Sequence, residues 1–247
     1  MDRAEEAAQR ALHTVVNECA ESGLTDALRG LVQEVYTTNL DRYEPDELGD
    51  TPRSFGFQCY ENLKERAPRR AHHDVREHPD AHWRISGLHV ATPGGVLTFE
   101  FAGARFVTMK VPYGQGRNPN WGGGVDWAHQ DSQVRAAIAA ENSEVLQYRT
   151  PAAGAASLFA HPGSPGTVQN FMLLWGGEAK TPLTAGWLAV PVLGERPFIA
   201  HERLWWDADR DAQVTQTPMP DRGPNFDERP AAALSMALKR RPQEGQA

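Results

Sequence analysis

Apolar and polar residues alternate along residues 96–111, with one interruption at residues 102–104. Such alternation is typical of β-strands that bury one face. Two alternating runs separated by a short segment that contains glycine predict a β-hairpin. A loop of three residues, 102–104, would place Phe99 opposite Val107. In this register, Phe99 and Val107 share the buried face of the hairpin.

Helical periodicity dominates the chain before this hairpin. Apolar residues recur at steps of three and four over residues 4–19 and again over 27–35, with Gly23 between the two runs. Both runs predict helices, and the short break predicts an antiparallel helical pair. Thr51-Pro52 is typical of a helix start, because Thr caps the helix and Pro suits its first turn. The polar residues 64–82 are rich in Arg and His and indicate a loop or a frayed helix end.

The remaining patterns predict more strands, with one helix between them. Residues 83–91 form a strand in this prediction, and a turn at 93–95 leads into the hairpin, which gives a three-stranded antiparallel meander. The fold class is therefore α+β, with N-terminal helices followed by two antiparallel β regions separated by a helix. The expected single domain, 1–206, comprises a helical part (1–66), the first meander (83–111), a helix (132–147) and a second β region (157–206), and a polar, proline-rich tail with a short helix follows (207–247).

Composition narrows the functional classes. The formal net charge of −7 over 247 residues argues against a surface that binds nucleic acid throughout. Two cysteines, Cys19 and Cys59, are too few for a disulfide scaffold, so we expect reduced thiols. The N-terminal residues lack the apolar core of a secretion signal, and no apolar run is long enough for a bilayer. We expect a soluble, cytoplasmic protein without membrane contact, and its Ala, Arg and Asp content is typical of high-GC bacterial genes.

Two polar segments are candidates for binding. A glycine-rich stretch, 114–124, lies between the hairpin and the next predicted helix, and long glycine loops often carry function. The Arg/His segment after residue 64 would form a local basic patch. We therefore predict a binding or regulatory module for a protein partner, with nucleic acid as the second choice and no cofactor. The candidate binding residues are Arg69, Arg70, His73, Arg117, Trp121 and Trp127.

The alternative is a metal-dependent hydrolase or nuclease. Some metal-dependent nucleases place an acidic residue on one hairpin strand and an acidic-x-Lys triplet on the next. Here Glu100 is followed by a triplet that ends in Lys110 but starts with Thr108, and the predicted register separates Glu100 from Lys110 by about 13 Å. We therefore expect the side chains of Glu100 and Lys110 to face solvent. An active site would need carboxylates from elsewhere, with Mg²⁺ or Mn²⁺ held by Glu47, Asp50 and Glu100 beside Lys110.

Other patterns favour structural roles. Asp207 opens a stretch that resembles a calcium loop, but Ala212 stands where the loop needs glycine and Pro218 where it needs glutamate. A polar turn after the last strand accounts for this stretch. Most of the seven tryptophans are expected in the core, and the neighbours Trp205 and Trp206 should face opposite sides of a strand.

Overall fold

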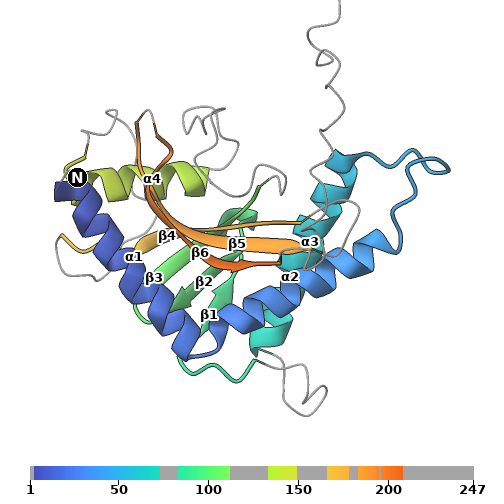
Figure 1. The fold of residues 1–247 in the computed structure, drawn as a ribbon, viewed down its shortest axis with the longest axis horizontal. Helices are drawn as coiled ribbons and strands as arrows, with labels where there is room; N and C mark the ends of the chain where they lie inside the picture. The colour runs from blue at the N-terminus through green and yellow to red at the C-terminus, as the bar shows by residue number, and fades with distance from the viewer. Residues whose placement is uncertain are drawn as a thin grey trace, which may run out of the picture. The chain divides into compact units, whose positions relative to one another are not determined.

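The structure is a computed structural model that describes residues 3–72, 83–111, 133–148, 166–177, 183–194 and 196–207. All of these residues belong to one compact unit, Met1–Asp209. The unit has the predicted α+β fold (Figure 1). Its helices are α1 (Arg3–Glu21), α2 (Leu24–Leu40), α3 (Pro52–His72) and α4 (Gln133–Val145), with a short 3-10 turn, η1 (Pro93–Gly95). Its strands are β1 (His89–Ala91), β2 (Thr98–Phe101), β3 (Ala104–Lys110), β4 (Asn170–Gly177), β5 (Thr184–Pro191) and β6 (Phe198–Trp206).

One sheet contains all six strands, in chain order from β1 to β6. Strands β1–β3 and β4–β6 each form an antiparallel meander, as the sequence predicts. The pattern did not show how the two meanders meet: β3 and β4 pair in parallel. Because parallel neighbours need a crossover connection, the chain passes through α4 between them. The protein therefore holds one parallel β3–α4–β4 unit at the centre of an otherwise antiparallel sheet.

Helices cover both faces of the sheet. Side chains of α1, α2 and α3 pack on one face with Phe99, Phe171 and Trp205, whereas α4 packs on the other with Met172 and Trp187. Figure 1 shows this division, with α4 alone on its side. Trp205 lies on the α1–α3 face and the neighbouring Trp206 on the α4 face, which confirms the alternation that the sequence predicts.

The hairpin register differs by one residue from the prediction. Ala102 and Gly103 alone form the turn, with φ values of 51° and 75°. Phe99 therefore pairs with Phe106, not with Val107. Alternation could not reveal this register, because both faces of β3 are covered and Phe106 and Val107 are equally buried. An alanine with positive φ is also an uncommon turn residue. The shift turns every side chain of β3 to the opposite face.

Helix α3 is longer than predicted. It continues through Pro68 to His72, where the polar composition indicated a loop. Proline removes one helical hydrogen bond and usually ends or bends a helix. Here packing on both sides of Pro68 favours the helix, because Leu63 and Ala67 are buried and Arg66 and Arg70 bond to α2. Tertiary contacts have thus outweighed the local preference.

Two smaller expectations were also wrong. The strand predicted over residues 83–91 is reduced to the three residues of β1, because Gly87 has a φ of 77° and lies in a turn before it. The helical pattern of residues 132–147 also predicts that Val145 faces inward, but Val145 is 37% exposed at the end of α4.

Candidate functional site

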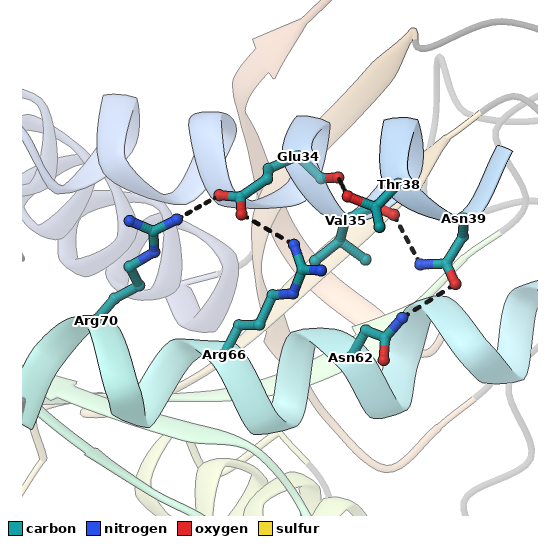
Figure 2. Close-up of polar contacts among 7 residues, drawn as sticks. All are labelled: Glu34, Val35, Thr38, Asn39, Asn62, Arg66 and Arg70. Atoms are coloured by element: carbon teal, nitrogen blue, oxygen red, sulfur yellow. Dashed lines mark hydrogen bonds and ion pairs between the residues drawn. The ribbon is translucent and has the colours of Figure 1, made fainter. Parts of the chain in front are cut away.

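The described arginines of the predicted basic patch, all on α3, are engaged within the protein. Arg66 and Arg70 both bond to the carboxylate of Glu34 on α2, at 2.9 and 2.6 Å (Figure 2). Arg69 lies 3.3 Å from Glu65. Each guanidinium therefore already has a carboxylate, and the patch carries less free positive charge than the sequence suggests. The remaining candidates of the binding hypothesis, His73, Arg117, Trp121 and Trp127, lie outside the described residues.

Further polar contacts between α2 and α3 are structural. The buried Asn39 donates to the backbone oxygen of Val35 at 2.7 Å, and its side-chain oxygen accepts a bond of 3.0 Å from Asn62 (Figure 2). Thr38 bonds back to the Glu34 carbonyl at 2.8 Å. With the Glu34 ion pairs, these contacts align the two helices along their shared side. This network stabilises helix packing and leaves few polar groups for a ligand.

The carboxylates of the metal hypothesis have separate surroundings. Glu47 is exposed, and Asp50 accepts a hydrogen bond from the backbone of its own turn. Glu100 lies 3.5 Å from the buried Arg105, on the sheet face opposite Lys110. Among the described residues, no three His, Cys, Asp or Glu side chains gather in a way that could hold a metal ion.

Lys110 has an environment that sequence reasoning missed. The prediction of a solvent-facing strand residue is wrong, because the shifted register places Lys110 on the face covered by α1–α3, where it is half-buried. Its Nζ lies 6.0 Å from the ring centre of Tyr36. Helix α3 comes close to Lys110 at Gly56, where an added Cβ would lie only 3.0 Å from Nζ. A glycine at this position therefore makes room for the amine.

The groups around Lys110 are uncharged. Burial raises the pKa of Cys59 to about 12 and raises that of Tyr36 well above its usual value, so both stay protonated at neutral pH. Trp175, paired with Lys110 across β3 and β4, is fully buried, and its indole N–H has no hydrogen-bond partner among the described residues. Burial lowers the pKa of Lys110, and no described carboxylate pairs with the ammonium group. We call Lys110, Tyr36, Gly56, Cys59 and Trp175 the Lys110 cluster.

A second desolvated cation lies near the same end of β3. Arg135, in the first turn of α4, donates through Nε and Nη2 to the backbone oxygen of Thr108 at 3.1 and 2.8 Å. It also hydrogen-bonds to Tyr60, whose ring stacks on Trp175 at 6.5 Å. Burial lowers the pKa of the Arg135 guanidinium.

This contact places the N-terminus of α4 beside the C-terminal end of β3. The described chain therefore stops after Val111 and resumes at Gln133 near the same end of β3, and residues 112–132 lie outside the described residues. In βαβ units, ligands commonly bind at the carboxyl ends of parallel strands. The Lys110 cluster lies at the carboxyl end of β3, in the parallel β3–α4–β4 unit.

Asp207, the first residue of the calcium-like stretch, is a buried structural carboxylate. Thr184 donates to it from both its backbone N–H and its hydroxyl, at 3.2 and 2.7 Å, and Gln33 donates at 2.8 Å. Arg29 on α2 completes the set. Burial acts to raise the pKa of Asp207, but these hydrogen bonds outweigh it and hold the pKa below the usual value. Its two oxygens are therefore occupied by the protein itself.

A scan against protein-family models found no match, and neither the curated proteins nor the solved structures yielded a similar chain. Inference about function therefore depends on the geometry described above. In the portion of the chain that the structure describes, every helix is too short or too polar to cross a lipid bilayer.

Proposed function

We propose that this chain is a binding module that receives an anionic group of its partner at Lys110. The observation that carries the proposal is a half-buried ammonium group without a described carboxylate partner. A buried charge is costly when it is unpaired, and an incoming anion would offset part of that cost. The pKa of Lys110 is lowered for the same reason, because burial disfavours the charged form of the amine.

The surroundings of Lys110 favour a specific contact over general attraction. The overall charge of −7 repels anions at long range, so an acidic partner has to be selected by local groups. Cys59 and Tyr36 remain neutral and do not compete for the ammonium group. An anion that reaches Lys110 therefore meets a cation that no group in the described part of the chain neutralises.

The partner that we propose is a protein with an exposed carboxylate, with nucleic acid as the second choice. The loop residues Arg117 and Trp121 are further candidates for contacts with the same partner, whereas Arg69 and Arg70 already pair with Glu65 and Glu34. We further propose that the module works in the bacterial cytoplasm. Both of its cysteines are free and buried, which suits a reducing compartment.

The test is a titration followed by amide NMR with three probes: acetate, a short oligoglutamate peptide and a single-stranded oligonucleotide. Acetate and the peptide should shift the amide signals of Gly56 and Gly177, and Lys110→Met should abolish these shifts. Lys64→Met is the matched control, since Lys64 is half-buried like Lys110 but already bonded to Glu61 at 2.5 Å. Equal shifts in wild type and Lys110→Met would refute the proposal. A response to the oligonucleotide alone would replace the protein partner by nucleic acid.

A further inference from the structure

We propose that Lys110 is also a carbonyl-reactive amine, which forms an imine with small aldehydes at the Lys110 cluster. This activity is different from anion binding, because it requires the neutral amine and not the ammonium group. The two properties share one side chain but make opposite demands on its protonation state. They can therefore be tested separately.

The packing around Nζ provides the geometric basis. The amine lies against the backbone of α3 at Gly56 and faces the ring of Tyr36, with the sheet beneath it. From α2 the facing titratable group is Tyr36, and from α3 it is Cys59; both are neutral, and β4 contributes the indole of Trp175. None of these groups supplies a negative charge that would hold the proton on Lys110. A lysine in such an apolar setting is a nucleophile that reacts with carbonyl compounds.

Lys64 provides the contrast within the same molecule. Its ammonium group is hydrogen-bonded to Glu61 at 2.5 Å, which raises its pKa. Lys64 is half-buried, as Lys110 is, but it is more firmly protonated than Lys110. Among the described residues these two are the lysines, so a difference in their rates of reaction reports mainly on protonation.

The reaction balances without an oxidant or a reductant. The lone pair of Nζ forms a bond to the carbonyl carbon, and the carbonyl π electrons move to oxygen, which takes up a proton. The resulting carbinolamine loses water as nitrogen forms the double bond to carbon, and the amine protons leave with the water and to solvent. The net change is amine plus aldehyde to imine plus water. The ligand class is thus an aldehyde that is small enough to reach the half-buried side chain of Lys110.

The experiment uses the full chain and pyridoxal, an aldehyde without a phosphate group. The imine is fixed by reduction with cyanoborohydride, and labelled peptides are identified by mass spectrometry. At neutral pH we expect the Lys110 peptide to be labelled faster than the Lys64 peptide, and Lys110→Arg to lose that label. Gly56→Ala should slow the labelling of Lys110, because the added Cβ displaces Nζ.

Faster labelling of Lys64 than of Lys110 in the wild type would overturn the proposal. The comparison of Lys64 with Lys110 uses the wild type alone, so it tests the proposal even if Lys110→Arg folds poorly. Acetate separates the two proposals for Lys110, since a bound carboxylate would keep the amine protonated and slow its labelling. Labelling that acetate does not slow supports imine formation and contradicts the anion site. Acetate binding with no labelling at Lys110 supports the anion site and contradicts imine formation.

Discussion

Replacing Asp207 by alanine should be one of the most destabilising single changes in the described structure. Asp207 joins the end of β6 to β5 and α2 through hydrogen bonds from Thr184, Gln33 and Arg29. Its removal leaves two donors of the fully buried Thr184, its N–H and its hydroxyl, without their acceptor. Arg29 and Gln33 reach solvent and can bond to water instead.

The expected loss in unfolding free energy follows from this difference in exposure. A buried donor left without an acceptor costs about 1–3 kcal/mol, whereas exposed donors cost little. The two Thr184 donors together with the lost charge therefore give about 3–5 kcal/mol. Urea unfolding monitored by tryptophan fluorescence measures this as a lower midpoint at an unchanged slope. Glu65→Ala, which removes an exposed ion pair with Arg69, is the control and should cost less than about 1 kcal/mol.

The same carboxylate predicts a pH dependence. Because the pKa of Asp207 is lower in the folded protein than its ordinary value of 3.8, ionisation favours the folded state. Its contribution is fully present above about pH 4 and is lost as the pH falls through the folded-state pKa. The wild type should therefore lose part of its stability advantage over Asp207→Asn on acidification. A loss below about 1 kcal/mol for Asp207→Ala, or an advantage over Asp207→Asn that does not change with pH, would refute this account of Asp207.

Three further results are expected. Gly177→Ala should lower the free energy of unfolding by about 1–3 kcal/mol in urea, because the added Cβ would lie 2.3 Å from the ring of Tyr36. Its control, Gly30→Ala on α2, meets no atom within 4 Å and should raise the free energy of unfolding by up to about 1 kcal/mol. Arg70→Ala should cost less than about 1 kcal/mol, and less still at high salt, because its partner Glu34 is exposed; a larger, salt-independent loss would contradict this. Millimolar Mg²⁺ or Mn²⁺ should not shift the melting temperature, and a clear rise would support the metal hypothesis over the binding module.

The helices and the two meanders could be predicted because their signals are local. Leu12, Val15 and Val16 form a helical stripe that α1 buries, and Phe55, Cys59 and Leu63 do the same for α3. The strands of each meander are separated by few residues, so their neighbours in space are also neighbours in sequence. These elements needed no knowledge of the rest of the chain.

The Lys110 cluster depended on information that the pattern lacks. Its position on the α1–α3 face follows from a two-residue turn at Ala102. Alternation could not fix this register, because both faces of β3 are buried. The neighbours Tyr36 and Trp175 come from distant parts of the chain. One signal was available: Lys110 is a lone charge between the apolar Met109 and Val111, at the end of a predicted strand.

The parallel pairing of β3 with β4 also has a kinetic consequence. The paired residues, from Arg105 with Asn170 to Lys110 with Trp175, are 65 positions apart, whereas the hairpins on either side close over short loops. Distant contacts slow folding because the intervening chain loses entropy before they form. We therefore expect each meander to collapse early and their union at the centre of the sheet to set the folding rate of the whole domain.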